Sequence, residues 1–190
     1  MKTKIDSYIK SAQDASKHLS SCSGDIAAVA ERLCSIFKGG GRLFTCGNGG
    51  STCDAMHLVE ELVARYKRER PGIRAHHLCD SATLTCWSND YNFASAFARQ
   101  TETLAAPSDA LAVFSTSGNS DNIVQALKAA KKVGCTSIGF LGRDGGEAAK
   151  LCDISVIVPV QVTSHIQEAH AVIIHAVCEA VETTLFPEAK

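Results

Sequence analysis

Residues 110–133 read ALAVFSTSGNSDNIVQALKAAKKV and predict a buried strand, a turn and an amphipathic helix in succession. The apolar run Ala110 to Phe114 is the strand, and Asn122 to Val133 repeats apolar residues at helical spacing. The turn between them, Ser115-Thr116-Ser117-Gly118-Asn119-Ser120, offers side-chain hydroxyls and unpaired backbone N–H groups, which suit a phosphate ester. The alternative is a simple helix N-cap, since Ser, Thr and Asn are favoured there whatever the ligand. Four hydroxyls in six residues exceed what one cap needs, so this turn is predicted to bind phosphate.

A second unit of the same design lies upstream. Arg42 to Cys46 is a short apolar strand, a glycine-rich turn follows at residues 47–51, and Asp54 to Arg65 continues at helical period. Glycines in this turn would let the backbone approach a ligand closely, and Asn48 and Ser51 supply polar contacts. Parallel sheets gather such loops at the carboxyl ends of their strands, so two units together indicate a parallel α/β fold.

The rest of the chain fits this fold class. Further strands are predicted at 73–78, 136–141 and 154–158, and helices at 4–20, 24–38 and 164–184, with a turn at 89–92 between two helical stretches. Five strands alternating with helices predict a mainly parallel sheet covered by helices on both faces. The two leading helices are expected to pack on the sheet or on a partner subunit.

Composition excludes several classes of protein. With 190 residues, 45% apolar and 21% charged, the chain suits one soluble domain. A net charge of −1 and 6% aromatic residues do not indicate a nucleic-acid surface. No signal peptide and no apolar segment of membrane-spanning length are present, so we expect a cytoplasmic protein with no membrane partner. Nine cysteines without a CxxC motif, mostly within apolar patterns, indicate small buried side chains in a reducing compartment.

Two predicted helices carry side chains suited to chemistry. His57 and Glu61 are four residues apart and share a helix face, where they could bind a metal, transfer protons or merely pair at the surface. Gln167 and His175 are eight apart on the last helix, about 12 Å along its axis and roughly 80° around it. His175 alone could be a satisfied core histidine. Taken together, His57, Glu61, Gln167 and His175 are the nitrogen and oxygen ligand types that zinc accepts.

Several motifs in order resemble one family. They are CGNGGS at 46–51, DAMHLVEEL at 54–62, Asn89-Asp90, STSGNS at 115–120, GRDGG at 142–146 and IQEAH at 166–170 followed by His175. On these motifs the chain resembles the sedoheptulose 7-phosphate isomerases (phosphoheptose isomerases) of the sugar isomerase (SIS) domain superfamily. The resemblance covers nearly the whole chain.

The resemblance implies a fold, an assembly and a reaction. The fold is a three-layer αβα sandwich forming a single SIS domain over 1–190, with a helical segment at 1–38 and an α/β core at 39–190. The assembly is a homotetramer with the N-terminal helices at the oligomer interface and active sites between subunits. The reaction converts D-sedoheptulose 7-phosphate to D-glycero-D-manno-heptose 7-phosphate, the first step toward the heptose of bacterial lipopolysaccharide or related surface glycans.

Site roles follow from the matched motifs. The resemblance implies one Zn²⁺ per active site, held by His57, Glu61, Gln167 and His175, with Glu61 and His175 as the catalytic pair. It places the phosphate on Ser115, Thr116, Ser117 and Ser120, near the first loop. The full set of implied substrate-binding residues is Asn48, Gly49, Gly50, Ser51, Glu61, Arg65, Asn89, Asp90, Ser115, Thr116, Ser117, Ser120 and Gln167.

The reaction type assigns the proton transfers. Moving a carbonyl from C2 to C1 requires removing a proton from C1, forming an enediol and returning a proton to C2. Glu61 is the expected carbon base, and His175 the acid that serves the oxygens. Since a carboxylate held firmly by a metal is a weak base, either Glu61 loosens its metal contact when substrate binds, or the metal mainly organises the site.

Two alternatives stay open at this stage. One is a non-catalytic SIS protein that binds the bacterial replication initiator, and residues 184–187 resemble the ending of such proteins. The other is a sugar-phosphate sensor without turnover. The presence of both Glu61 and His175 favours the enzyme. One departure from the family pattern is Ser164-His165, which stands where an Asp-Arg pair is usual. This replacement predicts a missing sugar or proton-relay contact, or one taken over by His165.

Overall fold

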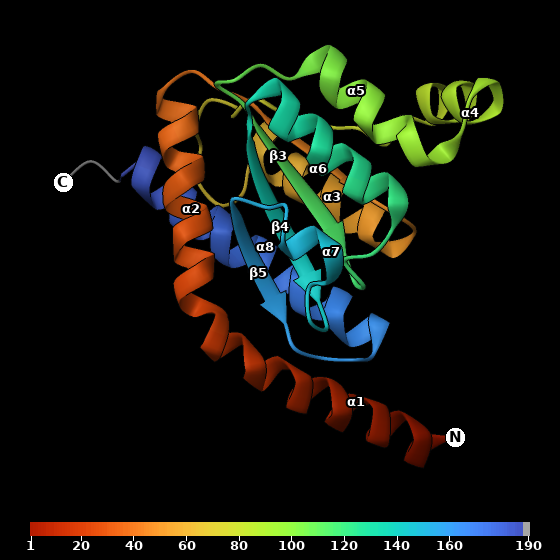
Figure 1. Cartoon of the computed structure of the whole chain (residues 1–190). Helices are drawn as coiled ribbons and strands as arrows, with labels where there is room; N and C mark the ends of the chain where they lie inside the picture. The colour runs from red at the N-terminus through yellow and green to blue at the C-terminus, as the bar shows by residue number, and fades with distance from the viewer. Residues whose placement is uncertain (188–190) are drawn as a thin grey trace.

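The computed structural model describes residues 1–187 and shows one five-stranded parallel sheet in the order β2-β1-β3-β4-β5 (Figure 1). All four strand pairings are parallel. The strands are β1 (Leu43–Gly47), β2 (Ala75–His77), β3 (Ala110–Ser115), β4 (Thr136–Gly142) and β5 (Ile154–Val158). The predicted parallel sheet is confirmed, with most strand ends within one residue of the prediction. β2 is shorter than the predicted 73–78 because only these three residues pair with β1.

Helices cover both faces of the sheet and make it the middle of three layers (Figure 1). One face packs against α2 (Ser23–Lys38), α3 (Gly50–Val63) and α8 (Thr163–Leu185), and the other against α5 (Ala96–Leu104), α6 (Asp121–Val133) and the short α7 (Gly146–Ala149). Successive residues of β3 point to opposite faces, so Phe114 belongs to the α3/α8 core and Val113 to the α6 core. This is the αβα sandwich that the sequence indicates.

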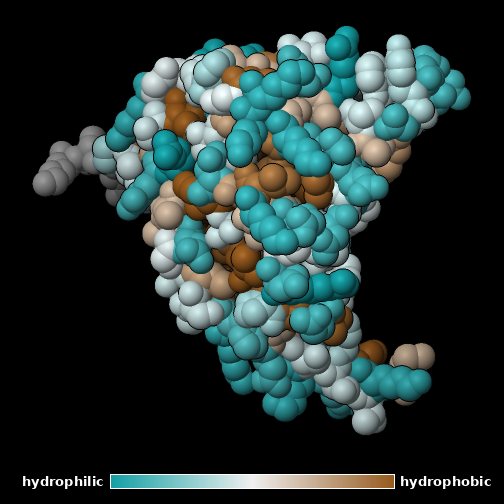
Figure 2. All heavy atoms as spheres, in the orientation of Figure 1, coloured by the Kyte–Doolittle hydropathy of each residue, from teal (hydrophilic) through white to brown (hydrophobic). Residues whose placement is uncertain are grey.

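The N-terminal helices differ from the prediction in one respect. The segment predicted as a single helix over 4–20 is α1 (Lys2–Ser16) followed by the 3-10 helix η1 (Lys17–Cys22). α2 packs on α8 and β5, whereas α1 extends beyond them, contacts the start of α8 and buries only Ala15 (Figure 1). In Figure 2 the projecting helix carries mostly hydrophilic surface. Ile5 and Ile9, one turn apart, are half exposed on it.

Both edges of the sheet are restricted. At one edge β2 pairs over only three residues. At the other, η1 lies against β5, where the thiol Sγ of Cys22 donates to the carbonyl oxygen of Ile157 at 3.3 Å. Pro159, which follows β5, has no N–H to extend the ladder.

The segment around residue 90 corrects the sequence prediction of a turn at 89–92. Asn89 and Asp90 form the last turn of α4 (Ser81–Asp90), and the chain turns after them, before the 3-10 helix η2 (Phe93–Ser95). Asp80 caps the start of α4 by accepting from the backbone N–H and the hydroxyl of Thr83, both at 2.8 Å. The chain turns only after Asp90, where Asn92 caps η2 by accepting from the backbone N–H and the hydroxyl of Ser95, both at 2.9 Å. α4 has no buried residue and projects from the body (Figure 1).

The nine cysteines are all free thiols. Burial raises the pKa of Cys135 to about 11 and those of Cys152 and Cys178 to about 12, so these thiols stay protonated at neutral pH. Cys53 and Cys86 are exposed. Within residues 1–187, no helix combines the length and the apolar character needed to cross a bilayer.

Candidate active site

The two predicted ligand loops meet at the carboxyl edge of the sheet. A reciprocal amide pair joins them: Asn48 Nδ2 donates to Asn122 Oδ1, and Asn122 Nδ2 donates to Asn48 Oδ1, both at 2.8 Å. Asn48 belongs to the glycine-rich turn after β1, and Asn122 is a buried residue in the first turn of α6. The neighbouring places of β1 and β3 in the sheet bring these turns together, as the parallel arrangement predicts.

The hydroxyl-rich turn after β3 is shaped by its own hydrogen bonds. Ser115 Oγ accepts from the backbone N–H of Gly118 at 3.0 Å, and Ser117 Oγ accepts from that of Asn119 at 3.2 Å. Gly118 has a φ of +65°, and a Cβ there would lie 1.9 Å from the carbonyl oxygen of Gly145. Only glycine fits at position 118, where the hydroxyl turn packs against the GRDGG turn at 142–146.

Several polar groups in this region remain available to a ligand. Ser120 is the N-cap residue of α6, but its hydroxyl makes no capping hydrogen bond. The Thr116 hydroxyl likewise has no partner among residues 1–187, and α3 begins after Gly49 without a side-chain cap. Uncapped helix N-termini beside free hydroxyls favour an anion. The alternative that this turn serves only as a helix N-cap is therefore not supported, because the Ser120 hydroxyl makes no capping hydrogen bond.

A histidine and carboxylate cluster forms between α3 and α8. His57 Nε2 lies 3.3 Å from Glu61 Oε1 and 3.3 Å from His175 Nε2, and His175 Nε2 lies 3.8 Å from Glu61 Oε1. The two histidines are 118 residues apart in sequence, and their rings meet edge to face at 4.9 Å. The ring of Tyr66 stacks on His175 at 6.0 Å. The Glu61 side chain is 14% exposed and that of His175 is 48% exposed, so the cluster is open on one side.

The donor set of this cluster fits a zinc ion. Its three ligand atoms, two imidazole nitrogens and one carboxylate oxygen, lie within 4.8 Å of one another. Ligands about 2.0–2.1 Å from a tetrahedral Zn²⁺ lie roughly 3.3 Å apart, which is the spacing found for two of the three pairs here. The open side leaves room for a further ligand or a substrate oxygen.

Gln167, the fourth predicted zinc ligand, belongs to α8, and its side chain lies against the first residue of α3. Its Nε2 and Oε1 would be 2.4 and 2.7 Å from a Cβ placed on Gly50, so the amide rests directly on that glycine. Gly50 and Gln167 are thus side by side, while His57 and His175 meet about two turns further along both helices. In this arrangement the Gln167 amide contacts the glycine-rich turn and not the cluster.

Three other predicted sugar contacts lie elsewhere in this chain. Arg65 was predicted on the helix, but α3 ends at Val63, and Arg65 pairs with Glu69 at 3.7 Å. The helix ends early because the carbonyls of its last turn accept hydrogen bonds from the side chain of Arg70 instead of continuing the ladder. Asn89 and Asp90 bond to each other at 2.9 Å on the projecting α4.

His165 is occupied by contacts with the N-terminal helix. Its Nε2 lies 3.0 Å from Ser11 Oγ and its Nδ1 lies 2.8 Å from Glu168 Oε2, and the Tyr8 hydroxyl donates to Glu168 Oε1 at 2.6 Å. Burial acts to raise the pKa of Glu168, but the hydrogen bonds from Tyr8 and His165 outweigh it and hold the pKa below its usual value. His165 therefore ties α1 to the start of α8.

Sequence reasoning missed two polar contacts near the site. One is Asn122, whose only local signal is its place after a hydroxyl-rich turn. The other is a buried pair between α3 and α8, in which Asp54 Oδ2 and His170 Nδ1 lie 3.8 Å apart and neither atom has a hydrogen-bond partner among the described residues. Both residues belong to quoted family motifs, so the motifs contained the signal without indicating the role.

Comparisons with known proteins agree with this geometry. The SIS domain family model matches residues 7–142. The chain is 47% identical over 162 residues to the phosphoheptose isomerase of Trichlorobacter lovleyi, covering 85% of this chain and 83% of that protein. It is 44% identical over 189 residues to that of Geotalea daltonii, covering 99% and 97%. The solved structure of a phosphoheptose isomerase from Francisella tularensis superposes with a TM-score of 0.92 at 33% identity, covering 95% of this chain and 97% of that one.

Proposed function

Because the chain belongs to the SIS domain family and, within it, to the phosphoheptose isomerases, we propose that it converts D-sedoheptulose 7-phosphate to D-glycero-D-manno-heptose 7-phosphate. The observation that carries this proposal is the convergence of His57, Glu61 and His175, brought together from α3 and α8. The cluster lies about 10.5 Å along α3 from the glycine-rich turn, a separation on the scale of an extended seven-carbon sugar phosphate. One end of the substrate would bind at the turns while the other reaches the cluster.

Glu61 is the base that moves hydrogen between the two carbons. Its carboxylate removes a proton from C1 of the ketose as the C2 carbonyl becomes an enediol, and the same proton returns to C2 as the carbonyl forms at C1. Its low exposure limits competition from water, while the 3.3 Å contact with His57 orients the carboxylate.

His175 serves the oxygens. Donation to O2 as the enediol forms, and acceptance of the O1 proton as the aldehyde forms, would keep charge from building up on either oxygen. His57, Glu61 and His175 would hold Zn²⁺, with Gln167 as the fourth ligand if its amide turns from Gly50 toward them. Since a donor atom held firmly by a metal cannot take up a proton, Glu61 and His175 would loosen their metal contacts when the substrate binds. A bound Zn²⁺ would supply electrophilic stabilisation of the substrate oxygens.

The hydroxyl turn would hold the phosphate. Thr116 and Ser120 have free hydroxyls, and Ser115 and Ser117 can still donate their O–H groups after accepting from the backbone. Asn48, Gly49, Gly50 and Ser51 would complete the pocket from the first loop. Binding this non-reacting end positions the sugar carbons at the cluster.

We also propose the homotetramer and its shared active sites. An apolar groove of ≈ 770 Å³ runs along α3 and β2 and reaches His57, with Met56 and Val63 exposed on it. α4 buries no residue, and Ile5 and Ile9 are half exposed on α1. Covering these surfaces with neighbouring subunits would place α1 and α2 at interfaces and could bring Arg65, Asn89 and Asp90 to a site shared with a partner. The reaction would take place in the cytoplasm and supply heptose for lipopolysaccharide or related glycans.

The decisive assay uses the purified full chain with D-sedoheptulose 7-phosphate, followed by NMR for the aldose product. Product should form, disappear when a zinc chelator is added, and return when Zn²⁺ is restored. Absence of product from Zn²⁺-loaded protein would contradict the proposed activity.

A further inference from the structure

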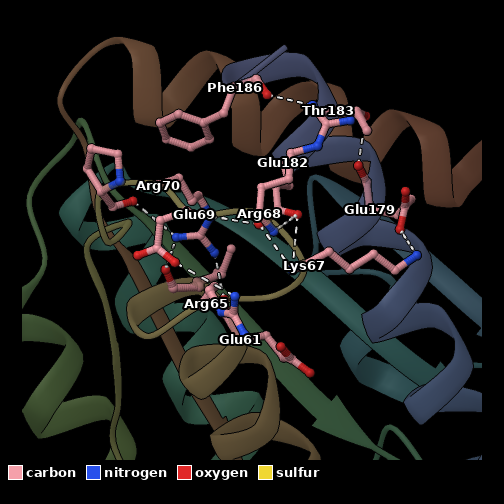
Figure 3. A network of polar contacts seen from close by, with 12 residues as sticks. Glu61, Arg65, Lys67, Arg68, Glu69, Arg70, Glu179, Glu182, Thr183 and Phe186 are labelled. Atoms are coloured by element: carbon pink, nitrogen blue, oxygen red, sulfur yellow. Dashed lines mark hydrogen bonds and ion pairs between the residues drawn. The ribbon is translucent and has the colours of Figure 1, made fainter. Parts of the chain in front are cut away.

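A buried ion pair joins the C-terminal ends of α3 and α8 (Figure 3). Arg70 Nε donates to Glu182 Oε1 at 2.9 Å, and the side chains are only 1% and 3% exposed. Arg70 lies in the loop after α3, and Glu182 lies near the end of α8. Charges buried this deeply are expensive unless every polar atom is paired, so the remaining bonds of the pair show what it holds.

The guanidinium of Arg70 caps the end of α3. Its Nη2 donates to the carbonyl oxygen of Glu61 at 2.7 Å and its Nη1 to that of Leu62 at 2.9 Å. These are carbonyls of the last helical turn, which lack intrahelical partners and favour a nearby cation. In Figure 3 the Glu61 carboxylate points away from Arg70. Arg70 therefore holds the backbone of Glu61, while the side chain of Glu61 contacts His57.

Glu182 holds the loop that carries Arg70. Its Oε2 accepts from the backbone N–H groups of Lys67 at 3.1 Å and Arg68 at 3.0 Å. Burial acts to raise the pKa of Glu182, but the hydrogen bonds from Arg70 and these N–H groups outweigh it and hold the pKa below its usual value. Glu182 therefore stays ionised at neutral pH and accepts from three donors at once.

The position of Glu182 on α8 links this pair to the His57, Glu61 and His175 cluster. Glu182 follows His175 by seven residues, two helical turns, and so lies on nearly the same face of α8. One end of the pair is thus fixed to the helix that carries His175, and the other is bonded to the carbonyl of Glu61 itself. The pair therefore connects the end of α3 to α8.

We propose that Arg70 and Glu182 are positioning residues that hold the Glu61 and His175 side chains at their mutual distance. This inference rests on the proposed function, in which those two side chains transfer protons and bind Zn²⁺. A displacement of about 1 Å in a reacting group can reduce turnover about 100-fold, and loss of residues that orient metal ligands typically weakens metal binding about 10- to 100-fold.

The test separates positioning from folding by replacing both charges together. In Arg70→Met/Glu182→Leu no buried charge is left unpaired, and such apolar replacements often preserve stability. We expect the double variant to fold with a lowered melting temperature, because the two backbone carbonyls held by Arg70 and the two backbone N–H groups held by Glu182 lose these partners. Zn²⁺ affinity and kcat should each fall about 10- to 100-fold. KM for sedoheptulose 7-phosphate should change less than about twofold, because the phosphate-binding turn is untouched.

Two single variants complete the design. Glu182→Gln keeps the size of the side chain and should lower Zn²⁺ affinity about three- to tenfold, a smaller loss than the double variant. Glu179→Gln breaks the neighbouring exposed pair between Lys67 and Glu179 and should match the wild type in every measurement.

Zn²⁺ affinity is measured by competition with a chromophoric chelator, independently of turnover. The proposal would be overturned by a folded double variant whose Zn²⁺ affinity and kcat lie within about twofold of the wild-type values. If the double variant does not fold, a wild-type Zn²⁺ affinity in Glu182→Gln would overturn the proposal instead. Wild-type protein that binds Zn²⁺ but does not convert sedoheptulose 7-phosphate would contradict the proposed function alone, leaving the affinity comparison to decide on positioning. Wild-type protein that does not bind Zn²⁺ would contradict both.

Discussion

The hydroxyl turn after β3 and the cluster between α3 and α8 are built in opposite ways. The turn takes its shape from bonds within a few residues, such as Gly118 N–H to Ser115 Oγ, and from one touching glycine turn. The cluster joins side chains 118 residues apart and depends on how two helices pack. A site for a non-reacting phosphate can be assembled locally, whereas proton transfer needs groups whose spacing is set by tertiary structure.

The strongest test of the cluster is Glu61→Gln, which removes the proposed base while keeping the size of the side chain. We expect kcat to fall about 1,000-fold or more, with the circular dichroism spectrum and melting curve preserved, because general bases typically contribute factors of about 10²–10⁴. Retention of near-normal turnover would show that another group removes the C1 proton.

His57→Ala tests whether the cluster binds metal. Removing one of three converging donors should weaken Zn²⁺ binding about 100-fold or more, measured by chelator competition. Ser120→Ala serves as the matched control, since it alters the turn and should leave Zn²⁺ affinity unchanged. Equal Zn²⁺ affinities in the two variants would show that the cluster does not bind the metal.

The turn should respond differently from the cluster. Thr116→Val and Ser120→Ala each remove a free hydroxyl, and each should raise KM about tenfold through loss of one hydrogen bond to a charged phosphate. kcat should stay within about threefold, because this interaction is the same in ground and transition states. A loss confined to kcat would mean that the turn takes part in chemistry and would erase the contrast between the two regions.

The smallest expected effect concerns stability at low pH. Glu182 has a folded-state pKa below its unfolded value, so its stabilisation is fully present above the unfolded pKa and is lost as pH falls through the folded pKa. Urea unfolding from pH 7 to pH 3 should therefore show a weaker pH dependence in Glu182→Gln than in the wild type. Parallel curves would indicate that Glu182 titrates alike in both states.

The contrast also explains how much the sequence could predict. The strands and the turn at 115–120 follow from local apolar runs and turn residues, and the strand pairings confirm the parallel arrangement. Resemblance identified His57, Glu61 and His175, but only packing shows that they meet. Arg70 and Glu182 were not predicted, because a charged residue in a loop gives no local sign that it will be buried. The hydrogen bonds from buried Arg70 to the last carbonyls of α3 also accompany the end of this helix at Val63, before Arg65.

The restricted edges of the sheet affect how the protein behaves when it is concentrated. A strand edge with many unpaired backbone groups is a template on which other chains can add and grow into aggregates. Here β2 offers three residues, and β5 is flanked by η1 and followed by Pro159. Association through sheet extension is therefore disfavoured, which leaves helical surfaces as the route by which copies of this chain can adhere without forming fibrils.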